Sequence, residues 1–318
     1  MAEKNGTTRS SNALTIVLIL VLALIASLSF VCIKFNNDLN VLKAEDATLK
    51  QEVLNKQKAY DEIDNKTNEI TAELEVYKNV KEAIKDIKED YFNKIYNLEQ
   101  DILNDKTDVK IAYLTFDDGP YLLSENFLNV LDEYDIPATF FYLMKSTETN
   151  YDQEVNDFYD YIYRRVITSG HTLGNHTSIH KFGENGIYAS MENFTKVVLD
   201  NRNFIYNRYG YTTEVFRFPG GSDTPRRYRS QMIEWLVENG YGYVDWNSAT
   251  GDGGAVLSPE EYRDNVLNYT AGKNILVVLM HDYSKNTLAA LPEIIEGLRD
   301  QGYTFLPLFN QSVACKKS

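Results

Sequence analysis

The sequence predicts an α/β protein: a (β/α) barrel with about seven parallel strands, preceded by a transmembrane helix and a long helical stalk. Three observations support this prediction. An uncharged apolar run lies near the N-terminus, at residues 14–33. The next segment, residues 35–118, contains neither glycine nor proline. From residue 108 onward, short apolar runs alternate with amphipathic segments of helical length, which is typical of βαβ units.

The apolar run Leu14–Ile33 has the length of a membrane helix. An α-helix needs about 20 apolar residues to cross a bilayer core of roughly 30 Å. A cleaved signal peptide has a shorter apolar core of about 7–15 residues, followed by a small-residue cleavage site, and this run shows neither feature. We therefore expect an uncleaved signal anchor, with residues 1–13 as a short cytoplasmic tail. Basic residues stand on both sides of the run, so their distribution does not fix its orientation.

The segment 34–107 is expected to form a helical stalk. Its apolar residues follow three-and-four spacing, which indicates a helix. The polar residues Asp46, Lys56 and Thr67 interrupt the apolar stripe, and polar residues in such a seam weaken a coiled coil. A solvated helix is the favoured interpretation, and a homo-oligomeric coiled coil is the alternative.

The region 108–318 is expected to form the (β/α) barrel. Its apolar runs predict strands, and the amphipathic segments between them predict helices. The runs are KIAYLTF, ATFFYL, EVFRF, YGYVDW, ILVVLM and YTFLPL. The helical segments lie near 124–134, 151–168, 189–208, 225–239, 258–270 and 286–301.

Charge and cysteine content exclude several classes of protein. The net charge of −14 and the pI near 4.8 argue against a nucleic-acid partner, because binding a phosphate backbone needs clustered Lys and Arg. The two cysteines lie far apart in the sequence, so the chain has no disulfide framework.

Polar residues that directly follow predicted strands are the candidates for chemistry, because barrel enzymes place their active sites at the carboxyl ends of strands. KIAYLTF runs into Asp117 and Asp118, and ILVVLM runs into His281. Two adjacent carboxylates at one strand end resist joint ionisation unless positive charge lies close by. A cationic group is therefore expected beside them.

The stretch HTSIH places His176 and His180 four residues apart, in a chain with four histidines. That spacing suits two ligands of one divalent metal ion, with an aspartate as the third ligand and a coordination position left for water. The H-E-x-x-H metalloprotease motif is excluded, because it needs Glu where Thr177 stands. The sequence also lacks a G-x-S-x-G nucleophile motif and a phosphate-binding loop.

Five motifs occur in the order TFDDGP, HTSIH, RFPGG, DWNSATGD and LMHD. In this order and over residues 108–310, the sequence resembles the polysaccharide deacetylases, the family-four carbohydrate esterases. The resemblance implies a distorted barrel and a metal-dependent hydrolase acting on non-peptide C–N bonds. The divalent ion would be zinc, with cobalt or another divalent ion as alternatives.

The resemblance also implies a role for each matching residue. Asp117 would be the general base, and Asp118 would bind the metal together with His176 and His180. His281 would be the general acid, and Arg217 would orient the base. Gly220, which follows Pro219, would donate its backbone N–H to the oxyanion. Leu279 would line the pocket for the acetyl methyl group.

The fourth motif departs from the family pattern D-x-x-D-W. Asp252 matches the second Asp, which tunes the acid histidine, but Ala249 and Gly253 replace the first Asp and the Trp. Asp245, followed by Trp246, is a rival for the same role. His171, in SGHTLGNH, is expected to be a hydrogen-bonded core histidine.

Together these features lead to the expectation of a cell-membrane enzyme with a single membrane span and an extracellular catalytic domain. Its partners would be the membrane and a cell-wall glycan, and its reaction would remove the acetyl group from N-acetylglucosamine in peptidoglycan. An aspartate at position 118 favours glucosamine over muramic acid as the acetylated sugar. The alternatives are an O-acetyl esterase acting on xylan or another acetylated polysaccharide, and a catalytically impaired wall-binding protein.

Overall fold

The computed structural model describes residues 51–144, 152–314 and 316. The expected cytoplasmic tail, the membrane helix Leu14–Ile33, the first part of the stalk and both cysteines lie outside the described residues. Within the described ranges, no helix combines the length and the apolar character that a membrane span requires. The chain divides into two compact units, residues 1–92 and 93–318.

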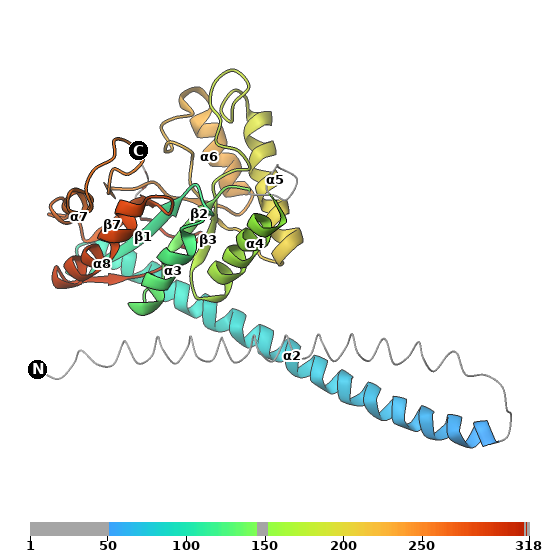
Figure 1. Ribbon diagram of the computed structural model, residues 1–318. Helices are drawn as coiled ribbons and strands as arrows, with labels where there is room; N and C mark the ends of the chain where they lie inside the picture. The colour runs from blue at the N-terminus through green and yellow to red at the C-terminus, as the bar shows by residue number, and fades with distance from the viewer. Residues whose placement is uncertain (1–50, 145–151, 315, 317–318) are drawn as a thin grey trace, which may run out of the picture. The chain divides into compact units, whose positions relative to one another are not determined.

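The helices and strands occur in the order shown by the colour gradient of Figure 1. The helices are α2 (Gln51–Leu103), α3 (Ser124–Glu133), α4 (Gln153–Thr168), α5 (Met191–Tyr209), the 3-10 turn η1 (Arg226–Tyr228), α6 (Arg229–Glu238), α7 (Pro259–Leu267) and α8 (Lys285–Asp300). The strands are β1 (Lys110–Asp117), β2 (Thr139–Tyr142), β3 (Thr172–Asn175), β4 (Val215–Phe216), β5 (Gly242–Tyr243), β6 (Ser248–Ala249), β7 (Ile275–His281) and β8 (Tyr303–Phe305).

The part of α2 that belongs to the first unit is a polar helix. Its apolar residues Leu74, Val76 and Ile87 are 49%, 54% and 40% exposed. The last turns of α2 belong to the second unit, where Ile95, Glu99 and Ile102 are buried. The second compact unit therefore begins at Asn93 and includes the last turns of α2.

The second unit is built on a curled parallel sheet. Seven strands follow the order β5-β4-β3-β2-β1-β7-β6, and β8 pairs with the first residues of β1. All the strand pairs are parallel. Each apolar run expected to be a strand contains one. The prediction of an α/β fold with about seven parallel strands is confirmed.

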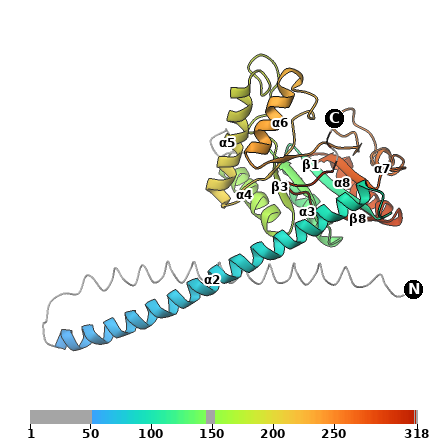
Figure 2. The ribbon, with the colours of Figure 1, turned by 180° about the vertical axis from the view of Figure 1, so that it is seen from behind.

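The curled sheet has apolar clusters on both of its faces, one enclosed by the strands and one between the strands and the helices. Alternate residues of β1 point to opposite faces: Leu114 and Phe116 pack outward with residues of α3, α4, α7 and α8, whereas Ile111 and Tyr113 pack inward. A second outer cluster joins β4 and β5 to α5 and α6. Figures 1 and 2 show these helices arranged around the strands.

Two strands, β3 and β6, were not expected from apolar runs. β3 has the sequence TLGN and is buried throughout. Its polar side chains satisfy their hydrogen bonds inside the protein: Thr172 donates to the carbonyl of Leu308 at 2.8 Å and Asn175 donates to that of Val198 at 3.0 Å. A buried strand can therefore be polar where long-range partners exist, and a pattern of apolar residues cannot reveal it.

The end of α2 closes the interior of the sheet through a buried carboxylate. Glu99 accepts hydrogen bonds from the Tyr113 hydroxyl at 2.6 Å and from the Val313 backbone N–H at 2.9 Å. Burial raises the pKa of Glu99, and these hydrogen bonds offset part of that effect. The contact connects α2, β1 and the C-terminal segment.

We predict that Tyr113→Phe destabilises the protein by about 1–3 kcal/mol, because it removes the donor to a buried carboxylate. Urea unfolding followed by tryptophan fluorescence measures the loss, since both tryptophans of the chain lie in the second unit. Tyr161→Phe is the matched control. It removes an exposed hydroxyl contact to Glu125 and should cost no more than about 0.5 kcal/mol. Equal effects of the two substitutions would contradict the role given to Glu99.

Candidate active site

The neighbouring strands β1 and β7 deliver the first site residues to the same edge of the sheet. Asp117 ends β1 and His281 ends β7, and the two residues are direct neighbours in the parallel register. Asp118 follows with a positive φ of 70°, which an aspartate tolerates better than most residues. The carboxyl ends of the strands thus gather the charged residues, as barrel geometry requires.

Asp118, His176 and His180 converge on one point. Oδ1 of Asp118 lies 3.3 Å from Nε2 of His176 and 3.8 Å from Nε2 of His180. One potential ligand atom from each residue falls within 4.8 Å of the other two. The structure therefore brings together the three side chains that the sequence predicts as metal ligands.

The hydrogen bonds around these residues leave the ligand atoms available. Nδ1 of His176 lies 2.8 Å from the carbonyl oxygen of Arg217, so this nitrogen carries a proton and Nε2 is the ring nitrogen that faces Asp118. Such a second partner is the usual way in which proteins orient a metal-binding histidine. Within the described part of the chain, the buried Oδ1 of Asp118 makes no hydrogen bond, as expected of an oxygen reserved for a cation.

The charges at the site also suit a divalent ion. Burial raises the pKa of Asp118, but the imidazoles of His176, His180 and His281 outweigh it and bring the value down to about 2. Burial lowers the pKa of His180. An ionised carboxylate and neutral imidazoles are the protonation states in which these groups bind metals. The residues present therefore fit a divalent cation.

Asp117 is held by a buried guanidinium. Arg217 has no exposed side-chain surface, and its Nη1 donates to Oδ1 of Asp117 at 2.9 Å and to the Thr115 hydroxyl at 2.6 Å. The guanidinium carbon lies 4.3 Å from the centre of the Phe141 ring. This environment fixes the orientation of the Asp117 carboxylate.

His281 is paired with Asp252. The ring Nδ1 lies 2.8 Å from Oδ1 of Asp252, and the backbone N–H of His281 donates to Oδ2 at 2.9 Å. Burial alone would lower the pKa of His281, but the hydrogen bond to Asp252 and the neighbouring carboxylates raise it to about 9. Nε2 of the same ring lies 3.8 Å from Oδ2 of Asp118. The imidazole therefore faces the candidate metal position in its protonated form.

The structure selects Asp252 over its rival Asp245. The carboxylate of Asp245 accepts hydrogen bonds from the backbone N–H and the hydroxyl of Ser222, at 2.8 and 2.6 Å. It therefore anchors the loop that begins at Pro219, rather than the acid histidine. Sequence reasoning did not anticipate this role, because Ser222 is 23 residues away along the chain.

The departures in the fourth motif have visible consequences around Leu279 and His281. Ala249 pairs with Leu279 in the register of β6 and β7, so a small side chain stands beside the half-buried Leu279. A Cβ atom at Gly253 would lie 3.1 Å from Cε1 of His281. A larger residue at position 253 would require the imidazole to move.

Pro219 and Gly220 form a turn beside the histidine pair. The carbonyl of Pro219 accepts a hydrogen bond from the Tyr188 hydroxyl at 2.8 Å. Gly220 has a φ of +73°, a conformation that residues with a Cβ rarely adopt.

A further cluster beneath the site was not predicted. The buried Asp282 accepts hydrogen bonds from Ser124 at 2.5 Å and from Tyr142 at 2.9 Å. Burial raises its pKa to about 6. A Cβ atom at Gly119 would meet Tyr142 at 2.2 Å and Asp282 at 2.8 Å. The cluster thus sets how closely the turn after Asp118 approaches β7. In the sequence, the only indication that Asp282 belongs to the site is its place in the LMHD motif.

His171 lies in the core, as expected. Its Nδ1 accepts a hydrogen bond from the Ala138 backbone N–H at 3.1 Å. Burial lowers its pKa to about 4, so the ring is neutral.

Comparisons with known proteins agree with this geometry. The family model described as polysaccharide deacetylase matches residues 104–244. The chain is 31% identical over 201 residues to a peptidoglycan-N-acetylglucosamine deacetylase of Bacillus cereus, an alignment that covers 62% of this chain and 68% of the relative. It is also 31% identical over 199 residues to a bifunctional xylanase/deacetylase of Pseudobutyrivibrio xylanivorans, covering 62% of this chain and 29% of that protein.

A solved structure shows the same fold. The catalytic domain of the peptidoglycan N-acetylglucosamine deacetylase from Eubacterium rectale superimposes with a TM-score of 0.58 and 32% identity, covering 66% of this chain and 93% of that one. The fold, the convergent site and the sequence similarity lead to one conclusion: the chain belongs to the polysaccharide deacetylase family, whose members are metal-dependent carbohydrate esterases.

Proposed function

We propose that this deacetylase removes the acetyl group from N-acetylglucosamine units of cell-wall peptidoglycan, releasing acetate and leaving a free amine on the glycan. The observation that carries the proposal is the convergence of Asp118, His176 and His180, with Asp117 and His281 beside them. This arrangement supplies a metal position, a base and an acid at one edge of the sheet, the three parts used in metal-assisted amide hydrolysis.

The residues of the chain divide the proton transfers between them. Asp117, held by Arg217, accepts a proton from the attacking water. The protonated Nε2 of His281 gives its proton to the departing amine nitrogen, because an amine leaves readily only after protonation. The backbone N–H of Gly220 donates to the oxygen that gains negative charge, and such a donor typically contributes about 10² to 10³ in rate.

Asp118, His176 and His180 would hold the divalent ion. When bound, the ion lowers the pKa of a coordinated water and polarises the acetyl carbonyl. Two imidazoles and one carboxylate suit zinc, and cobalt is an alternative.

The choice of N-acetylglucosamine rests on two supports. Relatives named as peptidoglycan-N-acetylglucosamine deacetylases recur among the similar proteins. In addition, position 118 is an aspartate, the residue that favours glucosamine over muramic acid. An O-acetyl esterase acting on xylan is the second candidate, favoured by the xylanase/deacetylase relative. In both reactions the roles of the site residues are the same, and only the acetylated atom differs.

The N-terminal region would place the active site in the wall. We infer that Leu14–Ile33 anchors the protein in the cell membrane, with residues 1–13 in the cytoplasm and the catalytic domain outside. The segment 34–107 would act as the stalk, either as a solvated helix or as a coiled coil between copies of the chain. The 53-residue helix α2 supports the helical character of the described part.

The proposed reaction predicts acetate release from peptidoglycan and chito-oligosaccharides by the zinc-loaded protein. Asp117→Asn should lower turnover by a factor on the order of 10² to 10⁴, the usual contribution of a general base, while zinc remains bound. His176→Ala should lose both zinc and activity. Acetylxylan assayed in parallel separates the two candidate functions. Zinc binding without acetate release from either polymer would instead indicate an impaired, wall-binding protein.

The pairing of His281 with Asp252 predicts a shift in pH dependence. Asp252→Asn removes the charge that holds the imidazole protonated, so the pKa of His281 falls. As the pH is raised, the variant should therefore lose its activity at a lower pH than the unchanged protein does, because the acid gives up its proton earlier. A shift of about 1–3 units in the basic limb of kcat is expected for the loss of a close opposite charge. Thr287→Val is the control, because it removes a hydrogen bond to Asp252 but keeps the charge. An unchanged basic limb in Asp252→Asn would refute the assignment of the acid.

A further inference from the structure

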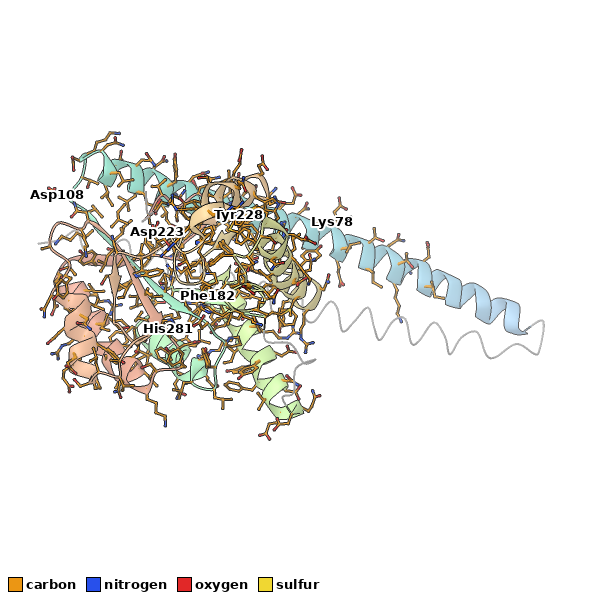
Figure 3. The ribbon with its side chains drawn as sticks, turned by 90° about the horizontal axis from the view of Figure 1, so that it is seen from above. Lys78, Asp108, Phe182, Asp223, Tyr228 and His281 are labelled. Atoms are coloured by element: carbon orange, nitrogen blue, oxygen red, sulfur yellow. The ribbon has the colours of Figure 1, made fainter. Side chains whose placement is uncertain are left out.

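An exposed aromatic ring stands beside the candidate metal position. Phe182 follows the ligand His180 by two residues, and 45% of its surface is exposed. The rings of Phe182 and His180 lie 5.0 Å apart at an interplanar angle of 82°. Figure 3 labels Phe182 and His281 close together in its view. The carboxylate of Asp118 lies 3.8 Å from Nε2 of His180 and 3.8 Å from Nε2 of His281.

The Phe182 ring rests on a supported base. It stacks on Tyr188 with a centroid distance of 5.9 Å and an interplanar angle of 30°. Tyr188 is fixed in turn, because its hydroxyl donates to the carbonyl of Pro219. A Cβ atom at Gly220 would lie 3.6 Å from Cζ of Phe182. The exposed ring is therefore built into the same corner as the Pro219–Gly220 turn.

We propose that Phe182 is a glycan-binding residue, on which a sugar ring of the polymer stacks while its acetyl group reaches the site. The inference rests on the proposed function and adds a contact that positions the substrate. Tyr188 and His180 cover part of the ring, and the exposed remainder of Phe182 is the surface offered to a ligand. A pyranose presents an apolar face of C–H groups, which suits an aromatic surface that would otherwise remain in contact with water.

The position of Phe182 determines which step it affects. Its ring contacts the ligand side of the site through His180, and the contacts described for Asp117 and His281 do not involve it. Removing the ring should therefore weaken glycan binding and leave the chemical step intact. Loss of an interaction made equally in the bound substrate and the transition state raises KM without lowering kcat.

The test compares Phe182→Ala with the unchanged full-length protein, both loaded with zinc. Chitotetraose is the glycan substrate, and methyl acetate is an acetyl ester without a sugar ring. Phe182→Ala should raise KM for chitotetraose about tenfold, which corresponds to about 1.4 kcal/mol, with kcat for chitotetraose and kcat/KM for methyl acetate unchanged. Phe182→Trp should restore KM, because it keeps an aromatic surface.

Tyr206→Ala is the matched control, because Tyr206 is 57% exposed and lies on α5, outside the site; its KM should not change. An unchanged KM in Phe182→Ala, or an equal loss on methyl acetate, would overturn the inference. If the unchanged protein releases no acetate, the proposed function fails. The stacking contact is then judged by titrating chitotetraose into both proteins. It stands only if the unchanged protein binds the oligosaccharide and Phe182→Ala binds it more weakly.

Discussion

The buried guanidinium of Arg217 is the interaction on which the catalytic unit depends. A fully buried cation is costly unless it is paired and hydrogen-bonded. Arg217 meets both conditions, with Asp117 as its counter-ion and the carbonyls of Val244 and Asp245 as further acceptors. In a flat sheet β4 and β1 would lie about 14 Å apart, three strand spacings, so this contact requires the sheet to curl.

The same residue ties the charged groups into one system. Its backbone carbonyl fixes the tautomer of His176, while its side chain neutralises Asp117. Asp252 pairs with His281, and Asp118 faces the imidazoles of His176 and His180, where a divalent ion would supply its positive partner. Separate positive partners would let the adjacent aspartates remain ionised in a largely buried site.

Two residues with an unusual backbone conformation lie at the candidate ligands. Asp118 and Thr177 have φ values of 70° and 74°, and a positive φ is unusual for a β-branched residue such as threonine. Thr177 is held there by a hydrogen bond from its N–H to the side chain of Asn175 and by another from its hydroxyl to the carbonyl of Ile179. Strain of this kind persists only where the surroundings enforce it, and it is common at functional sites. The surrounding contacts offset this cost and hold the two turns that orient the ligands.

The sequence by itself determined the parallel α/β fold and predicted the site residues Asp117, Asp118, His176, His180 and His281, which the structure brings to one edge of the sheet. Asp117, Asp118 and His281 follow apolar runs, and His176 and His180 are recognised by their four-residue spacing, so local patterns indicate both the fold and these residues. The tertiary structure decided what depends on distant partners. It paired Asp252 rather than Asp245 with His281, revealed the polar strand β3 and the Asp282 cluster, and placed Phe182 and Tyr188 against the Pro219–Gly220 turn. Hydrogen bonds and ring contacts between segments far apart in the chain leave no periodic signal, so only the folded arrangement shows them.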